Sequence, residues 1–292
     1  MRDVLRAYAR GFEAMAAVAR ASHPALYEGG WHPTSVCGVI GSAVAAACML
    51  EADADRALAL VLLRGAGLLS AFGTDMKSLQ VGMAAAAGAR GARLASAGAD
   101  VLVESVLRAF EEGYGATWSD PDPDAPAIHE NWIKAYPCCL QTHSSIEAAD
   151  EARSAGAVEG RVRVRVHPLS MRAAPYGVPA TSLEAKFSIP YTVAFTLLHG
   201  PPTVRDFGSL YEPALRVAGD VDVEGDPGLG QSDAVLVSDG RTFGVTTALG
   251  SPERPMSEEQ LAEKRRSLAA TDPGEWFDAG TSADDVVKRL LD

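Results

Sequence analysis

Apolar positions recur at helical spacing throughout the first 115 residues, and this pattern predicts a helical domain. Val4, Tyr8, Phe12 and Met15 form one such stripe near the N-terminus. The expected helices cover about residues 4–19, 36–50, 53–70, 81–99 and 99–113. Residues 36–50 and 81–99 are nearly all small, so these two helices are expected to pack closely at the centre of a bundle.

Two residues mark the expected helix ends in this half. Asp53 or Asp55 can cap the start of the third helix, because a short polar side chain there accepts a hydrogen bond from an otherwise unpaired backbone N–H. Gly113 is a plausible cap at the end of the fifth helix. No alternating strand pattern occurs before the Pro/Asp-rich stretch 119–131, which is predicted to be a linker.

Beyond the linker the periodicity changes, and the second half is predicted to be α+β. Residues 161–168 alternate strictly between valine and arginine, which is typical of a half-buried strand. Further strands are expected at 131–140, which includes Lys134, at 214–226 and at 232–249, where SDGR forms a turn. The expected helices are 143–156, 182–200 with Pro190 as a kink or a start, and one begun by a Ser257/Gln260 capping box.

These patterns predict a helical domain over residues 1–120, an α+β domain over 128–250 and a return to helix over 251–292. The chain has 292 residues, of which 47% are hydrophobic, enough for a sizeable core. Its net charge of −12 argues against nucleic acid and anionic membranes as partners. The apolar run 36–50 is too short to span a bilayer comfortably, and without a signal peptide we expect a cytoplasmic protein.

The candidate chemistry lies in a few polar residues surrounded by apolar or glycine-rich sequence. His32 precedes Pro33 and Thr34 at the start of a buried helix, where it could hold an anion or move a proton, or could simply cap the helix. Lys77 lies between two apolar helices and could pair with a substrate carboxylate or be an exposed loop residue.

A second group of candidates follows the linker. Lys134, His143 and the helix that His143 opens could together form an anion site, although charged residues often point outward from strands. Cys138 and Cys139 are adjacent but lie in no motif specific to a nucleophilic cysteine, so we interpret them as structural. Dinucleotide, ATP, zinc-protease and α/β-hydrolase motifs are absent, and neither a metal nor a cofactor is expected.

Four blocks of the sequence occur in an order that resembles the MmgE/PrpD family. The blocks are GWHPTSVCGVIGSAVAAA, GTDMKSLQVGMAAAAGARGA, IKAYPCCLQTHSSIEAA and PATSLEAKFSIPYTVAFTLLHG. The family includes 2-methylcitrate dehydratase, cis-aconitate decarboxylase and iminodisuccinate epimerase. The resemblance covers roughly residues 1–270 and does not choose among these reactions.

The resemblance implies a helical domain, completed by the C-terminal tail, and a smaller inserted α+β lid. It also implies a homodimer, a cleft between the domains as active site, and no metal or organic cofactor. By its motifs, His32, Lys77 and Lys134 surround the carboxylates and the reacting carbon of a small substrate. Gln80 stands where some relatives carry a histidine, which puts the substrate contacts there in doubt.

The resemblance further implies a longer N-terminal helical segment that supplies an aspartate and another histidine, and no such block occurs in this chain. One hypothesis is a dehydratase, decarboxylase or epimerase, with His32 as acid/base group, Lys77 and Lys134 as carboxylate clamps, and Thr34 and His143 as further substrate contacts. The missing groups would then come from a partner chain in a heteromer. The alternative is a non-catalytic relative that binds a ligand or a partner.

Overall fold

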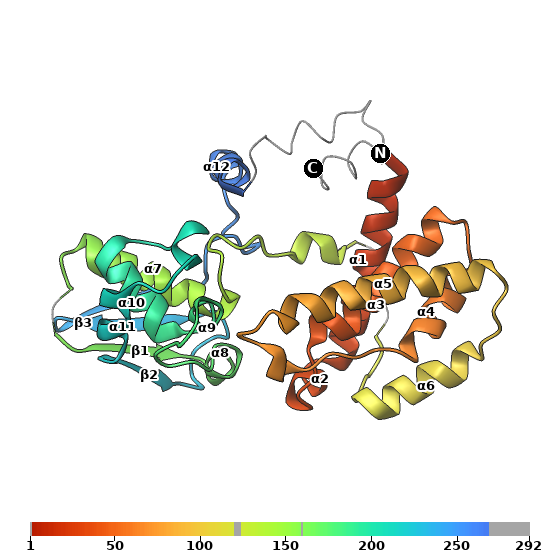
Figure 1. Ribbon diagram of the computed structural model, residues 1–292, viewed down its shortest axis with the longest axis horizontal. Coiled ribbons are helices and arrows are strands. Elements are labelled where there is room, and N and C mark those ends of the chain that lie inside the picture. The colour runs from red at the N-terminus through yellow and green to blue at the C-terminus, as the bar shows by residue number, and fades with distance from the viewer. Residues whose placement is uncertain (1, 120–123, 159, 269–292) are drawn as a thin grey trace. The chain divides into compact units, whose positions relative to one another are not determined.

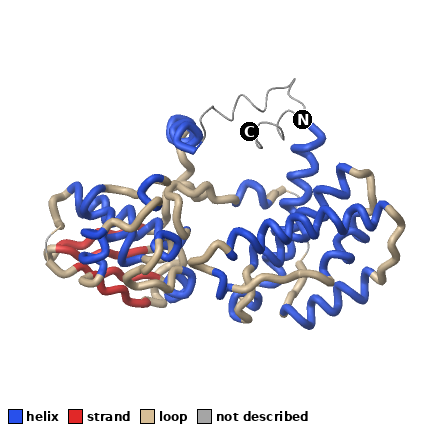
Figure 2. Tube along the Cα trace, viewed as in Figure 1, coloured by secondary structure: helices blue, strands red, loops and turns tan. Residues whose placement is uncertain are grey.

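In the computed structural model the chain folds into two compact units, each described here by itself (Figure 1). The structure describes residues 2–119, 124–158 and 160–268. The first unit includes residues up to Glu130 and the second begins at Asn131. Figure 2 shows the first as helical and the second as the unit that contains the strands.

The first unit is a bundle of α-helices. Its helices are α1 (Arg2–Ser22), α2 (Ala25–Glu28), α3 (Pro33–Met49), α4 (Ala54–Leu62), α5 (Met76–Ser96) and α6 (Val103–Tyr114), with the short 3-10 turns η1 (Leu69–Ala71) and η2 (Ala127–Glu130). The helix α3 packs against α1, α4 and α5, and its Ile40 and Ala43 are fully buried. The expectation that the two small-residue helices pack closely is confirmed for α3 and α5. The expectation that both lie at the centre is wrong for α5, whose Leu79 and Met83 are exposed.

Glycine allows the backbones of these helices to approach closely. A Cβ atom added at Gly11 of α1 would press into the carbonyl oxygen of Gly41 in α3. On the other side of α3, a Cβ added at Gly88 of α5 would lie 2.5 Å from the carbonyl oxygen of Val39. Small residues at these crossings therefore set the spacing between the helices.

Some helix boundaries differ from those that the sequence predicts. Asp53 caps α4 by accepting from the backbone N–H of Arg56 at 3.0 Å, but the helix ends at Leu62 rather than near residue 70. The helix α6 runs past Gly113 to Tyr114 and is capped by Gly115, whose φ of 65° lies in the left-handed region. Lys77 lies in the first turn of α5 and not in a loop.

The second unit combines a four-stranded sheet with helices. The strands β1 (Val162–Val166), β2 (Val221–Gly225), β3 (Ala234–Ser238) and β4 (Arg241–Val245) are ordered β2-β1-β3-β4. Only the β1–β2 pair is parallel. The helices are α7 (His143–Ser154), α8 (Pro168–Ala173), α9 (Ser182–Ala185), α10 (Ile189–His199), α11 (Glu212–Ala218) and α12 (Glu258–Leu268), with the 3-10 turns η3 (Leu140–Thr142) and η4 (Arg205–Phe207).

The two faces of β1 match the alternation in the sequence. Val162, Val164 and Val166 are buried, and α7 and α10 pack against each other and against neighbouring strands. The exposed Arg165 pairs with Asp226 at 2.8 Å, one of three arginine–carboxylate pairs on the solvent-exposed face of the sheet. Such exposed pairs contribute little to stability, so the buried valines hold the strand in place.

Three predictions for this half are refined or overturned. The strand expected at 131–140 is absent, because residues 131–139 form an irregular segment in which the N–H of Ile133 donates to Gly250 O at 2.8 Å. The first part of 214–226 is the helix α11, and only its end is a strand. Pro190 occupies the first turn of α10, where its missing N–H is harmless, so it starts the helix rather than kinking it.

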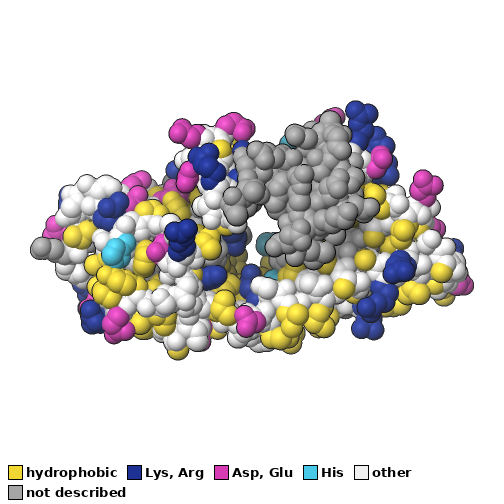
Figure 3. All heavy atoms as spheres, turned by 45° about the horizontal axis from the view of Figure 1, so that its top comes forward, with side chains coloured by type: hydrophobic (Ala, Val, Ile, Leu, Met, Phe, Trp, Pro, Cys, Tyr) yellow, Lys and Arg dark blue, Asp and Glu magenta, His cyan; other side chains and the backbone are white. Residues whose placement is uncertain are grey.

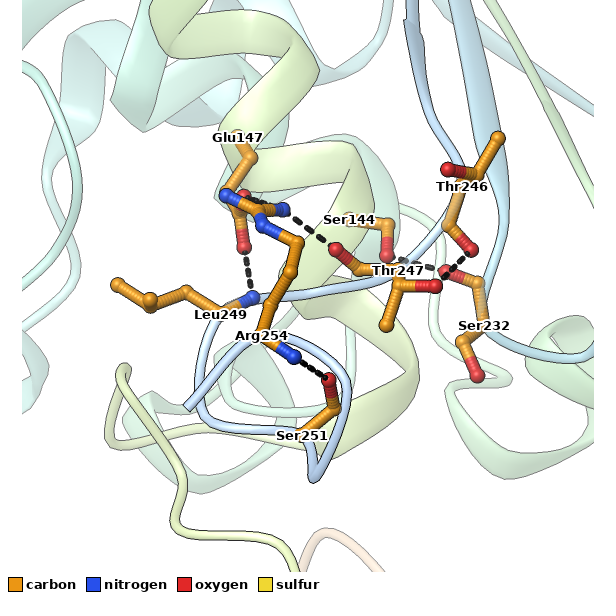
Figure 4. Close-up of polar contacts among 8 residues, drawn as sticks. All are labelled: Ser144, Glu147, Ser232, Thr246, Thr247, Leu249, Ser251 and Arg254. Atoms are coloured by element: carbon orange, nitrogen blue, oxygen red, sulfur yellow. Dashed lines mark hydrogen bonds and ion pairs between the residues drawn. The ribbon is translucent and has the colours of Figure 1, made fainter. Parts of the chain in front are cut away.

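The loop 246–254, between β4 and α12, is fastened to α7 (Figure 4). Glu147 accepts from the backbone N–H of Leu249 at 2.7 Å and from the Arg254 side chain at 2.8 Å. The capping box at the start of α12 is confirmed, since Ser257 and Gln260 exchange two backbone–side-chain hydrogen bonds. Within the range 251–292, where a return to helix is expected, the structure describes α12, which belongs to the second unit. The remaining part of that expectation, residues 269–292, lies outside the described residues.

Both units bury thiols. Burial raises the pKa of Cys37 in α3 and of Cys138 in the second unit to about 12 each. Cys139 is also buried, with its Sγ 3.7 Å from the Ala173 carbonyl oxygen.

Within the described residues, no helix combines the length and the apolar character needed to cross a bilayer.

Candidate functional site

His32 is held at the start of α3 by a short bridge between two backbone segments. Its own N–H donates to Gly67 O at 2.9 Å, and Trp31 forms an isolated antiparallel bridge with Leu68. His32 is the N-cap residue of α3, but its side chain makes no capping hydrogen bond. His32 is 2% exposed, so its ring is buried at the start of α3 without capping the helix.

The imidazole of His32 is bound by Gln80 of α5. The Gln80 Nε2 lies 2.6 Å from the His32 Nδ1, and the same amide pairs with both main-chain groups of Leu68. The Gln80 main-chain oxygen also accepts from Ser35 Oγ at 3.2 Å. Gln80, which stands where the resemblance implies a histidine in some relatives, therefore contacts His32 directly.

Phe72 lies beside both His32 and Lys77. The His32 and Phe72 rings meet edge to face with centroids 5.1 Å apart, and Lys77 Nζ lies over the Phe72 ring at 5.1 Å. Burial, aided by the positive charge of Lys77, lowers the pKa of His32 from 6.5 to about 4. His32 is thus a neutral imidazole near a lysine at physiological pH.

A cavity of about 710 Å³ lies next to this cluster, with Gln80, Ser35 and Leu68 in its wall. Apolar side chains of α5 line it as well, among them Met76 and Met83. Thr34, the remaining candidate of this unit, is exposed in the first turn of α3. The structure thus brings His32 and Lys77 together around Phe72, with Gln80 between His32 and the cavity. Neither His32 nor Lys77 is among the residues that line the cavity, and the side chain of Thr34 lies on the surface.

In the second unit, Lys134 and Lys264 line one cavity of about 510 Å³. Lys134 Nζ donates to Cys138 O at 2.9 Å, and Lys264 Nζ donates to Lys134 O. Burial and the neighbouring Lys134 both lower the pKa of Lys264. Two cations that share a cavity in this way suit an anion with more than one negative oxygen.

His143 opens α7 as expected but is fully buried behind Tyr136. The two rings meet edge to face with centroids 5.1 Å apart, and Tyr136 rather than His143 lines the cavity. Burial, and secondarily Lys134, lower the pKa of His143 to about 3. Neither ring nitrogen has a hydrogen-bond partner of good geometry in the described residues, although main-chain groups of Tyr136 and Cys138 lie near.

Two residues of these clusters, Lys264 and Phe72, were not predicted from the sequence. Lys264 lies 130 residues from Lys134 on a polar helix, and Phe72 is an ordinary apolar residue, so only the fold shows their contacts. The described residues contain no group of three His, Cys, Asp or Glu side chains arranged to hold a metal ion.

Comparison with protein families covers nearly the whole chain. The MmgE/PrpD N-terminal domain matches residues 1–125, and the MmgE/PrpD C-terminal domain matches residues 136–275. The protein belongs to the MmgE/PrpD family. The boundary between the two matches falls at the division between the helical unit and the strand-containing unit.

Two MmgE/PrpD relatives of known activity are similar to this chain. Cis-aconitate decarboxylase of Homo sapiens is 28% identical over 296 residues, which covers 90% of this chain and 60% of the relative. The Mus musculus cis-aconitate decarboxylase is 27% identical over 276 residues, covering 82% and 56% respectively. The chain therefore spans about 60% of the length of these relatives.

Proposed function

We propose that this MmgE/PrpD protein is a lyase or isomerase that acts on a small polycarboxylate by moving a proton on a carbon next to a carboxylate. The observation that carries the proposal is the buried neutral His32 next to the Lys77 cation. Removing such a proton builds negative charge on the carboxylate oxygens, and a nearby cation and hydrogen-bond donor stabilise that charge.

The cavity that Lys134 and Lys264 line in the second unit supports a substrate with several carboxylates. Lys77 and Lys134 are proposed to bind substrate carboxylates, and Lys264 adds a second positive charge beside Lys134. The similarity to cis-aconitate decarboxylase makes a tricarboxylate the natural first probe. Dehydration, decarboxylation and epimerisation share the proton step, so the proposal stops at that step.

Two further residues have proposed roles beside these cations. His143 is proposed to support Tyr136 from behind, and Thr34 to contact substrate from α3.

The experiment is proton exchange in D₂O followed by NMR, with cis-aconitate, citrate and succinate as probes. We expect deuterium at a carbon next to a carboxylate in a tricarboxylate probe, and His32→Ala should abolish the exchange. His129→Ala is the matched control, because His129 is an exposed histidine of the same unit. Binding of the probes without any exchange would instead favour a ligand-binding protein.

We also propose that the protein works as an oligomer, either a homodimer or a heteromer. Support comes from large apolar side chains that are exposed on α5 outside the cavity, namely Leu79 and Leu94. Figure 3 shows hydrophobic side chains on the surface of the helical unit among charged ones. Native mass spectrometry of protein isolated from its own host distinguishes one chain type from two, and a monomer would contradict the proposal.

A further inference from the structure

The amide of Gln80 can adopt only one orientation in this structure. Its Oε1 accepts from the Leu68 N–H at 3.0 Å, and its Nε2 donates to Leu68 O at 3.2 Å. Rotating the amide by 180° would set oxygen against carbonyl oxygen and N–H against N–H. Leu68 is itself fixed by its bridge with Trp31, so the backbone dictates which end of the amide faces His32.

The end that faces His32 is the nitrogen. The Gln80 Nε2 lies 2.6 Å from His32 Nδ1, and an amide NH₂ group has only protons to offer. Nδ1 must therefore contribute its lone pair and carry no proton. Because a neutral imidazole carries one proton, that proton resides on Nε2.

We infer that Gln80 is a positioning residue that holds His32 as the neutral Nε2–H tautomer, so that His32 acts on an anionic substrate as a hydrogen-bond donor and not as a base. This inference rests on the proposed function for its chemical meaning, although the tautomer can be measured without a substrate. In this tautomer the lone pair of Nδ1 accepts the hydrogen bond from Gln80. Nε2 carries the proton and has no free lone pair, so neither nitrogen can accept a proton from the substrate.

The electrostatics around His32 support this role. A lowered pKa keeps the imidazole neutral over the whole physiological range, with burial as the main cause and the Lys77 charge as the second. A neutral donor can stabilise negative charge that develops on a substrate oxygen during the reaction, as a donor in an oxyanion hole does. The proton stays on Nε2 throughout, and another group must remove the proton from carbon.

The first test is two-bond ¹⁵N–¹H NMR of the histidine rings in the full chain at pH 7. The six histidines give separate ring patterns, and the pattern that disappears in His32→Gln belongs to His32. We expect the neutral Nε2–H pattern in the parent protein. An Nδ1–H pattern, a mixture of tautomers or an imidazolium would overturn the inference.

The second test changes the partner of Nδ1. The carboxylate of Gln80→Glu can only accept a hydrogen bond, so Nδ1 must donate one and His32 should become Nδ1–H or imidazolium. Gln231→Glu makes the same change at an exposed glutamine of the other unit and should leave the His32 pattern as in the parent. An unchanged His32 pattern in a folded Gln80→Glu protein would contradict the positioning role.

The third test reads the chemical consequence through proton exchange. In the parent, His32 should contribute no limb to the pH profile of the exchange rate near 6.5, because His32 does not titrate there. In Gln80→Glu, kcat should fall by about 10- to 100-fold and acquire a new pH-dependent limb between about pH 6 and 8. A parent with the Nε2–H tautomer but no exchange would refute the proposed function alone. Exchange in a parent with Nδ1–H would refute this inference alone.

Discussion

At the scale of single residues, Lys77 is the cation of the helical unit that we propose binds a substrate carboxylate. Lys77 extends from the first turn of α5 over the ring of Phe72, which also touches His32. A charge-assisted hydrogen bond to a carboxylate contributes about 1.5–3 kcal/mol. The effect of Lys77 should therefore be large enough to measure in substrate binding.

We predict that Lys77→Ala raises KM for a tricarboxylate by about 10- to 100-fold, because a bound carboxylate loses its ion pair. Steady-state kinetics of the exchange reaction measure this change. Arg90→Ala is the matched control, since it removes an exposed positive charge from the same helix. Equal KM values for the two variants would rule out a specific role for Lys77.

A second prediction concerns Lys264, whose lowered pKa reflects burial and the nearby Lys134. Lys264→Met should reduce the rise in melting temperature that a tricarboxylate produces, because the cavity keeps only one of its two cations. The comparison is Arg216→Met on α11 of the same unit, where Arg216 is exposed, pairs with Glu212 at 3.6 Å and does not line the cavity. Equal ligand-induced shifts in both variants would show that Lys264 does not bind the anion.

At the scale of elements, glycine governs how closely α1, α3 and α5 pack. A side chain at Gly11 would collide with the backbone of α3, and one at Gly41 would lie 2.9 Å from the Gly11 carbonyl oxygen. A collision with backbone cannot be relieved by a rotamer change, so the helices themselves must separate.

Gly11→Ala should accordingly destabilise the protein by about 1–3 kcal/mol through overpacking. Gly113→Ala is the counterpart in α6, where an added Cβ meets nothing within 4 Å. There the change should stabilise by about 0.5–1 kcal/mol by reducing the freedom of the unfolded chain. Urea unfolding of both variants measures the difference, and equal effects would show that the α1–α3 crossing does not depend on glycine.

The elements also show what the sequence could predict. The alternation in 161–168, the SDGR turn and the Ser257/Gln260 box are local signals, and each forms the expected structure. The strand expected around Lys134 fails because the segment pairs with Gly250, 117 residues beyond Ile133, instead of with a neighbouring strand. The contacts of the candidate site could not be predicted from the sequence for the same reason. Gln80 meets His32, and Lys264 meets Lys134, only because the chain folds back on itself, and no local sequence pattern marks these pairs.

At the scale of the whole molecule, each unit contains a buried histidine that stays neutral. The pKa values of His32 and His143 are lowered to about 4 and about 3, mainly by burial. Below pH 6.5 the unfolded chain binds protons that the folded chain does not. Stability from these two groups is therefore complete above pH 6.5 and is lost as the pH falls toward 4.

Replacing His143 should reduce this acid sensitivity. We predict that His143→Phe, which keeps a ring beside Tyr136, loses less unfolding free energy between pH 7 and pH 4.5 than the parent does. His129→Gln, a change at an exposed histidine, should follow the parent curve. Urea unfolding across this pH range gives the comparison, and parallel curves for parent and His143→Phe would contradict the assignment.

The buried thiols of the two units also make local opening visible by chemical labelling. An alkylating reagent attacks the thiolate, and Cys37 and Cys138, with pKa values of about 12, form almost none at neutral pH while folded. Each becomes reactive when the structure around it opens, and the two residues belong to different units. The alkylation rates at these cysteines, read by peptide mass spectrometry, would therefore time the opening of the helical unit and of the sheet-containing unit separately in a single sample.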